Sequence, residues 1–250
     1  MSLQRVIAVV PVRMGSSRLP GKTLMPIAGK PMLGHLLDRL KLAEGIDAIV
    51  VATPDSPDND VVEAYTKSQN VSCFRGDEDD VLSRLLGALE SEKADVGVVA
   101  FGDAPLVDPK IIDEIIGRFL KDGGYDFLGN DLTTTYPPGM EVEVFKLSAL
   151  QDSDTRTQDP RIREHGTLFI RQHPDLYTVQ NVEAPALLNR PELEIEVDTN
   201  EDMDVITAIV EHFSGRMDYS LAEIISFLDA SPDLVEKNTH IERRWREFRA

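Results

Sequence analysis

The chain has 250 residues and a formal net charge of −18, with 44 acids against 26 bases, so its overall field repels nucleic acid and anionic membrane surfaces. The single cysteine, Cys73, excludes an intrachain disulfide and a cysteine-rich metal cage, and it favours the reducing cytoplasm as the compartment. No apolar run is long enough to span a membrane. From the charge and the lack of such a run, we expect neither a nucleic acid nor a membrane as partner.

Short apolar segments alternate with amphipathic segments through the first half of the chain. Runs rich in β-branched residues predict buried strands at residues 5–12, 47–53, 71–74 and 95–101. Apolar residues at helical spacing predict helices at 31–43, 58–68 and 79–91, and another that begins at Asp108-Pro109. This alternation with short links indicates an α/β fold, in which a mainly parallel sheet is covered by helices on both faces.

The pattern changes after Tyr125. Strands are predicted at 125–131, 140–147, 176–182 and 193–197, with a turn at 136–139 and a helix near 159–173. Further helices are predicted from Thr199, from Ser220, which forms an S-x-x-E capping box with Glu223, and in the tail from Asn238. We therefore expect a main domain over residues 1–214, containing a β-rich insertion near 125–185, and a C-terminal helical extension over 215–250.

A glycine-rich loop with no acid, VRMGSSRLPGK at residues 12–22, follows the first predicted strand. Gly15 lets the backbone approach an anion closely, while Arg13, Arg18 and Lys22 supply positive charge that suits phosphate. The spacing fits neither a P-loop nor the dinucleotide fingerprint. In parallel sheets ligands lie beyond the C-terminal ends of strands. The loop is therefore predicted to bind phosphate in such a crevice.

Two acids lie at predicted strand ends. Asp103, in FGDAPL, follows the strand at 95–101, and Asp198, in IEVDTNED, follows the strand at 193–197. Two carboxylates beside a phosphate site suit Mg²⁺, which prefers few carboxylates together with phosphate oxygens. Asp103 would otherwise be a turn residue, and Asp198 a helix cap. Because a cationic loop accompanies them, we favour the metal role.

Eight segments along the chain carry a family resemblance. They are, in order, VRMGSSRLPGK, RGDEDDVLSR, GDAPLVDP, YPPGMEVEVF, REHGTLFIR, NVEAP, NRPEL and VDTNEDMDVI. With them the chain resembles the cytidylyltransferases of the spore-coat polysaccharide biosynthesis protein F family, relatives of the CMP-Kdo and CMP-acylneuraminate synthetases. The resemblance implies a Rossmann-like nucleotide-diphospho-sugar transferase fold. It also implies transfer of CMP from CTP to an acidic keto-sugar for surface glycans, release of pyrophosphate, Mg²⁺ as cofactor and a homodimer.

The resemblance also assigns roles to individual residues. It implies a nucleotide site of Pro11, Arg13, Gly15, Ser16, Arg18, Lys22, Gly76, Arg84 and Asp103. It implies Arg13, Lys22, Asp103 and Asp198 as catalytic residues, of which Asp103 and Asp198 hold the Mg²⁺. For the sugar it implies Tyr136, Glu141, Glu164 and His165.

Two other functions remain open. A metal-dependent glycosyltransferase of similar fold would use an already activated sugar. Such enzymes normally carry a D-x-D motif after a central strand, but Phe101 occupies the position two residues before Asp103. A non-catalytic nucleotide-binding protein would not need both the acids and the cations that this sequence contains. The sequence therefore favours the cytidylyltransferase.

Overall fold

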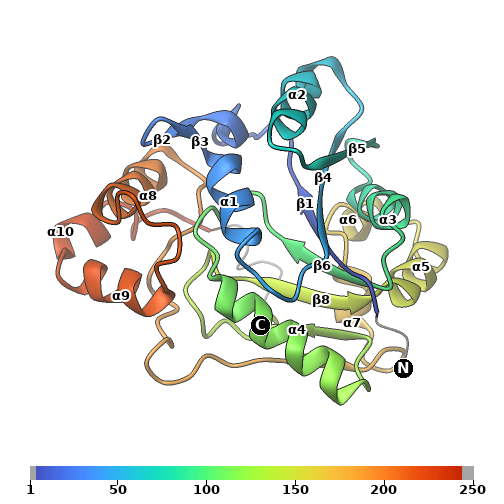
Figure 1. The fold of residues 1–250 in the computed structure, drawn as a ribbon. Coiled ribbons are helices and arrows are strands. Elements are labelled where there is room, and N and C mark those ends of the chain that lie inside the picture. Colours follow the sequence, from blue (N-terminus) through green and yellow to red (C-terminus); the bar gives the residue numbers. More distant parts are fainter. Residues whose placement is uncertain (1–3, 244–250) are drawn as a thin grey trace.

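A seven-stranded sheet forms the centre of the computed structural model, which describes residues 4–243 (Figure 1). Its strands lie in the order β5-β4-β1-β6-β8-β7-β9, and among them β8 alone runs antiparallel to both neighbours. The strands are β1 (Val6–Pro11), β4 (Ala48–Pro54), β5 (Ser72–Gly76), β6 (Val96–Ala100), β7 (Phe127–Gly129), β8 (Val142–Lys146) and β9 (Val179–Asn181). A separate hairpin consists of β2 (Pro26–Ile27) and β3 (Lys30–Pro31).

Helices cover both faces of the sheet. One face packs against α1 (Met32–Leu40), α2 (Asp60–Ser68) and α4 (Pro109–Asp122). The other packs against α3 (Val81–Ser91), α5 (Leu147–Arg156) and α7 (Leu168–Gln172). The remaining elements are α6 (Pro160–Arg163), α8 (Asn200–His212), α9 (Leu221–Asp229), α10 (Pro232–Val235) and the 3₁₀ turns η1 (Lys22–Leu24) and η2 (Pro57–Asn59). Within residues 4–243, no helix has the length and apolar character needed to cross a bilayer.

Strand β1 explains why the predicted strands read as continuous apolar runs. Val6, Ala8 and Val10 belong to the apolar cluster on one face of the sheet, whereas Ile7 and Val9 belong to the cluster on the other. All five residues are buried, because side chains alternate between two covered faces. The predicted α/β fold, with its mainly parallel sheet, is confirmed.

The order of the strands reverses at β1. From β1 the chain passes to β4 and β5 on one side, and it then returns to place β6 on the other side of β1. At such a reversal the loops that follow the two central strands leave a crevice at the C-terminal edge of the sheet. The loop at 12–22 follows β1 and Asp103 follows β6, so the fold brings both to this edge.

The β-rich insertion predicted near 125–185 does not form a sheet of its own. Its strands extend the central sheet through β8, which pairs with β6. The strand predicted at 193–197 is wrong: these residues make isolated backbone hydrogen bonds, from Ile195 N–H to the Pro138 carbonyl (2.9 Å) and from Val197 N–H to the Asp103 carbonyl (2.8 Å). The alternating pattern there reflects burial of Ile195 and Val197, without a regular ladder.

Two helix predictions also need correction. The helix predicted near 159–173 is interrupted at Gly166, which has φ +58°, and forms the short helices α6 and α7. A Cβ at Gly166 would lie 2.6 Å from Leu85 Cδ1, so the break lets the chain approach α3 closely. The tail predicted as helical from Asn238 forms turns and irregular structure up to Arg243. Its remaining residues lie outside the described range.

Helix α1 carries a buried arginine that connects it to the C-terminal part of the chain. The side chain of Arg39 is fully buried and donates hydrogen bonds to the carbonyls of Val107 (2.8 Å), Met217 (2.9 Å) and Tyr219 (2.9 Å). Its guanidinium carbon lies 4.5 Å from the centre of the Tyr219 ring. Burial lowers the pKa of Arg39. These bonds attach the segment before α9 to the core.

Replacing Arg39 with alanine is expected to destabilise the fold by about 3 kcal/mol, because it leaves a cavity and removes the partners of three carbonyls. Chemical denaturation of the purified variant measures this loss. The matched control is Arg156→Ala, which removes an exposed arginine paired with Asp152 within α5. Its expected cost is below about 1 kcal/mol. Equal costs for the two variants would contradict the role assigned to Arg39.

Candidate active site

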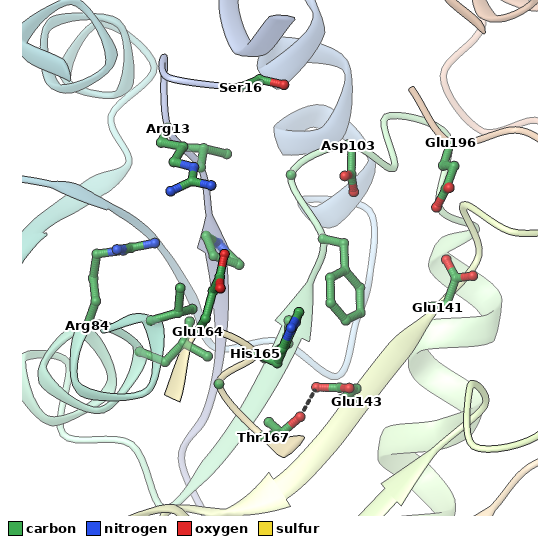
Figure 2. Close-up of a pocket in the computed structure, with 18 of the residues that line it drawn as sticks. Arg13, Ser16, Arg84, Asp103, Glu141, Glu143, Glu164, His165, Thr167 and Glu196 are labelled. Atoms are coloured by element: carbon green, nitrogen blue, oxygen red, sulfur yellow. Dashed lines mark hydrogen bonds between the residues drawn. The ribbon is translucent and has the colours of Figure 1, made fainter. Parts of the chain in front are cut away.

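A cleft of about 650 Å³ opens at the C-terminal edge of the sheet, beside the loops that follow β1 and β6 (Figure 2). Its walls come from the loop at 12–22, from α3, from the Asp103 loop and from residues around β8 and α7. Figure 2 shows Arg13 and Arg84 on one side and Glu141 and Glu196 on the opposite side. The cleft therefore has a cationic side and an acidic side.

Most of the predicted site residues line this one cleft: Pro11, Arg13, Ser16, Arg18, Lys22, Arg84, Asp103, Glu141, Glu164, His165 and Asp198. Three predicted residues do not. Gly15 lies in the loop between residues that do line it, and Gly76 ends β5, where it packs against Phe74 and Arg84. Tyr136 is 3% exposed within the apolar core, a placement that gives its predicted contact with sugar no support.

The loop at 12–22 is held by its own backbone. Gly21 adopts φ +78°, a left-handed conformation that favours glycine, and its N–H donates to the carbonyl of Met14 (2.9 Å). Met14 N–H in turn donates to Asn59 Oδ1 (2.9 Å), and the Thr23 hydroxyl donates to the Arg13 carbonyl (3.0 Å). These bonds fix where the loop's cations leave the backbone.

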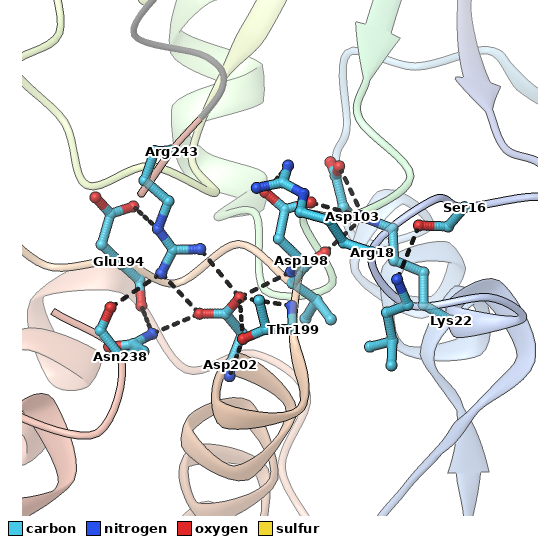
Figure 3. Close-up of polar contacts among 12 residues, drawn as sticks. Ser16, Arg18, Lys22, Asp103, Glu194, Asp198, Thr199, Asp202, Asn238 and Arg243 are labelled. Atoms are coloured by element: carbon cyan, nitrogen blue, oxygen red, sulfur yellow. Dashed lines mark hydrogen bonds and ion pairs between the residues drawn. The ribbon is translucent and has the colours of Figure 1, made fainter. Parts of the chain in front are cut away.

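Lys22 connects the two predicted metal-binding acids (Figure 3). Its Nζ lies 3.2 Å from Asp103 Oδ2 and 3.1 Å from Asp198 Oδ1, and it donates to the carbonyl of Val197 (2.6 Å). Arg18 Nη2 lies 2.5 Å from the other Asp198 oxygen. Burial opposes the charged form of Lys22, but the two carboxylates outweigh it and raise the pKa of Lys22. Asp103 and Asp198 lie 81 and 176 positions after Lys22 in the sequence, and they meet at its ammonium group.

Arg13 and Arg84 supply positive charge farther along the cleft. The side chain of Arg13 makes no hydrogen bond or ion pair with any residue in the range 4–243. Arg84 is 3% exposed, its Nη1 donates to the carbonyls of Asp77 and Glu78, and its Nε has no partner there. Burial and the nearby charge of Arg13 lower the pKa of Arg84. Two neighbouring cations, one without a counter-charge, are typical of a site for a multivalent anion.

The opposite half of the cleft is rich in carboxylates. Glu143 accepts hydrogen bonds from the Thr167 hydroxyl (2.7 Å) and from Arg171 Nη1 (3.2 Å). Arg171 Nη2 lies 3.1 Å from Asp131, whose side chain is fully buried. Burial lowers the pKa of His165, which favours a neutral ring. This half offers hydrogen-bond acceptors for hydroxyl groups, and its cation, Arg171, is already paired.

Comparison with known proteins assigns the chain to a family. A family model described as "Cytidylyltransferase" matches residues 7–238. The chain belongs to the cytidylyltransferase family. The resemblance on which the sequence analysis relied is thereby confirmed.

Two relatives and one solved structure show how far the likeness extends. The chain is 35% identical to the spore coat polysaccharide biosynthesis protein SpsF of Bacillus subtilis over 234 residues, 91% of this chain and 95% of that protein. It is 39% identical to an 8-amino-3,8-dideoxy-manno-octulosonate cytidylyltransferase of Shewanella frigidimarina over 121 residues, about half of each chain. A cytidylyltransferase structure from Leptospira borgpetersenii superposes with a TM-score of 0.90 and 29% identity, covering 96% of this chain and 100% of that one.

The donor set of this cytidylyltransferase fits a magnesium ion shared with phosphates. Asp103 and Asp198 both place an oxygen within 3.2 Å of one point, the Lys22 ammonium. The side chain of Asp103 is 35% exposed, so a ligand in the cleft can reach it. Within the described residues no group of three acids, histidines or cysteines converges on a metal position. Two carboxylates suit Mg²⁺ only if a bound ligand supplies the other oxygens.

The sequence analysis missed several residues that line the cleft: Ser17, Asp131, Glu143, Thr167, Arg171 and Glu196. A signal existed for two of them. Glu143 follows Glu141 at the two-residue spacing of a strand, and Glu196 stands in an apolar segment directly before Asp198. Arg171 carried no such signal, because only the break at Gly166 turns α7 toward the cleft.

Proposed function

We propose that this cytidylyltransferase transfers CMP from CTP to an acidic keto-sugar of the octulosonate or nonulosonate type and releases pyrophosphate, in surface glycan biosynthesis. The observation that carries the proposal is a single cleft in which Arg13, Arg18 and Lys22 face Asp103 and Asp198. The name of the Shewanella relative, which acts on an octulosonate, supports an acidic keto-sugar as acceptor.

The cationic side of the cleft would bind the triphosphate. Arg13 has no counter-charge in the described chain and lies close enough to Arg84 to lower its pKa, so an anion between them relieves repulsion. The guanidinium groups of Arg13 and Arg18 suit two-pronged contacts with phosphate oxygens. Lys22 adds a single positive charge beside both acids. We assign the nucleotide to this side.

Asp103 and Asp198 would hold Mg²⁺, which would supply positive charge beside the phosphate groups. Lys22 lies between these acids and would then turn toward the phosphates. A hydroxyl oxygen of the sugar attacks the α-phosphorus in line and loses its proton to water. The bond between that phosphorus and the oxygen that bridges it to the β-phosphate breaks, and pyrophosphate leaves. Lys22 and Arg18 stabilise the charge that builds on the leaving group.

The carboxylate-rich half would bind the sugar. Glu141 and Glu143 offer acceptors for the many hydroxyl groups of a keto-sugar acid, and Glu164 reaches the cleft beside Arg84 (Figure 2). The negative carboxylate of that sugar would have to lie nearer the cationic side, because Arg171 already pairs with Asp131 and Glu143. This requirement places the reactive end of the sugar beside the α-phosphate.

A homodimer in the cytoplasm is part of the same proposal. Measuring the mass of the protein in solution tests whether it is a dimer.

Pyrophosphate release tests the proposed function. The protein is incubated with each of the four NTPs, Mg²⁺ and a panel of keto-sugar acids, neutral sugars and amino sugars. We expect release that requires both CTP and a keto-sugar acid. Turnover of a nucleotide sugar without pyrophosphate would instead indicate a glycosyltransferase. Tight CTP binding without turnover on any acceptor would indicate a nucleotide-binding protein.

Replacing His165 with asparagine is expected to raise the KM for the sugar about tenfold, the cost of one lost hydrogen bond. The KM for CTP is expected to change little, because the proposal assigns His165 to the sugar and the loop at 12–22 to the triphosphate. Steady-state kinetics with each substrate varied in turn measure both constants. The control is His212→Asn, on the exposed end of α8. A rise in the KM for CTP alone would contradict the assignment.

A further inference from the structure

The segment that carries Asp198 is held from two sides (Figure 3). On the side of the cleft, Lys22 contacts the Val197 carbonyl and the Asp198 carboxylate. On the other side, the backbone N–H groups of Asp198 (2.9 Å) and Thr199 (2.8 Å) donate to Asp202 Oδ2 at the beginning of α8. The position of Asp198 thus depends directly on the position of the Asp202 carboxylate.

The Asp202 carboxylate is held by residues from the C-terminal end of the described chain. Arg243 donates from Nη1 to Asp202 Oδ2 (3.0 Å) and from Nη2 to Oδ1 (2.7 Å). Asn238 Nδ2 donates to the same Oδ1 (2.8 Å) and to the carbonyl of Glu194 (3.0 Å). The side chains of Arg243 and Asp202 are fully buried. A buried two-pronged pair of this kind fixes the orientation of a carboxylate as well as its charge.

A second helix of the same protein shows that capping alone does not require such a pair. Both α8 and α9 begin with a capping box, formed by Thr199 and Asp202 in α8 and by Ser220 and Glu223 in α9. In α9 the acid of the box pairs with Arg216, whose side chain is 49% exposed. Only at α8, beside the cleft, is the equivalent acid paired with a fully buried arginine among the residues described. The capping box with the buried arginine is therefore the one whose acid also holds the backbone of Asp198.

We propose that Arg243 and Asn238 are positioning residues, which act through Asp202 to hold the backbone of Asp198 in place for nucleotidyl transfer. The inference rests on the proposed function of Asp198. It gives the C-terminal extension a part in the reaction, where the sequence analysis separated it from the main domain. Partners behind the ligands of a metal typically affect metal affinity or activity by about 10–100-fold.

The test compares Arg243→Gln and Arg243→Lys with Arg216→Gln, which removes the exposed arginine of the second capping box. In folded Arg243→Gln we expect kcat to fall about 10–100-fold and the apparent affinity for Mn²⁺ in the presence of CTP to weaken by a similar factor. Electron paramagnetic resonance of free Mn²⁺ measures that affinity without turnover. The KM for the sugar and all constants of Arg216→Gln are expected to stay within about threefold of wild type.

Arg243→Lys keeps the charge but not the two-pronged contact, so we expect an intermediate loss of kcat and Mn²⁺ affinity at a nearly unchanged Tm. If Arg243→Gln does not fold, Arg243→Lys tests the positioning role of Arg243 instead. Wild-type kcat and Mn²⁺ affinity in either folded variant would overturn the inference. If the wild-type protein releases no pyrophosphate from CTP with any acceptor, the proposed function fails instead, and the Mn²⁺ affinities still test the role of Arg243.

Discussion

Replacing Asp103 with asparagine is expected to lower kcat about 10³-fold, the scale observed when one group that stabilises transition-state charge is removed. Asparagine keeps the size and shape of the side chain but removes the negative charge that a magnesium ligand needs. The fold is expected to survive, because Asp103 lies in a loop, is 35% exposed and has Lys22 as its ion-pair partner. Single-turnover kinetics and a thermal melt of the same sample measure the two effects separately.

The chain offers a matched control for Asp103. Asp38 is a partly exposed aspartate (30%) that also pairs with a lysine, Lys30, but it lies on α1 outside the cleft. Asp38→Asn removes a carboxylate of similar exposure and is expected to leave kcat within about twofold of wild type, because surface ion pairs contribute little. Wild-type activity in Asp103→Asn would refute the metal-binding role of this residue.

Replacing Lys22 with methionine is expected to lower kcat about 10²–10³-fold and to raise the KM for CTP. The side chain of Lys22 is 13% exposed and its ammonium contacts both acids, so its removal takes away the cation that the two carboxylates share. The bound nucleotide would also lose a cation beside its phosphates. Initial rates over a range of CTP concentrations measure both constants.

A purely structural role for Lys22 predicts a different result. A lysine that only joined the two acids would lower Tm when replaced, whereas the folded fraction would turn over at the wild-type rate. Lys30→Met is the matched control, because Lys30 pairs with one aspartate away from the cleft. Equal kcat values for Lys22→Met and Lys30→Met would contradict the catalytic assignment.

The sequence predicted the parts of the fold that depend on local patterns. The buried strand at 5–12 and the helix at 79–91 have clear periodicity, and the structure contains them as β1 and α3. The start at Asp108-Pro109 is also confirmed: Asp108 accepts from Lys110 N–H at the beginning of α4. Such signals are reliable because capping and alternating burial act between residues that are close in sequence.

Two of the three failures involve contacts between distant segments. Residues 193–197 have the alternation of a strand, yet they make backbone bonds to Pro138 and Asp103 one at a time. The helix α5 was not predicted because its second half, DSDTR, is polar and shows no apolar periodicity. The helix near 159–173 breaks at Gly166 because of its close approach to Leu85. No local pattern encodes the backbone contacts of residues 193–197 or the approach of Gly166 to Leu85.

The candidate site follows the same division. The cationic loop and Asp103 were predictable, because each directly follows a strand of the parallel sheet. The ion pairs that join Lys22 to Asp103 and Asp198 could not be predicted, since their partners are separated by 81 and 176 positions in the sequence. The role of Arg243 was the hardest to predict from the sequence. Nothing in a mixed-charge tail indicates that one arginine is fully buried against Asp202.

A crystal structure of the protein with CTP and Mg²⁺ tests the central claim most directly. It is predicted to show the triphosphate between Arg13, Arg18 and Lys22, with the metal bound to Asp103, Asp198 and phosphate oxygens. A nucleotide bound elsewhere, or a triphosphate whose metal contacts neither Asp103 nor Asp198, would contradict it.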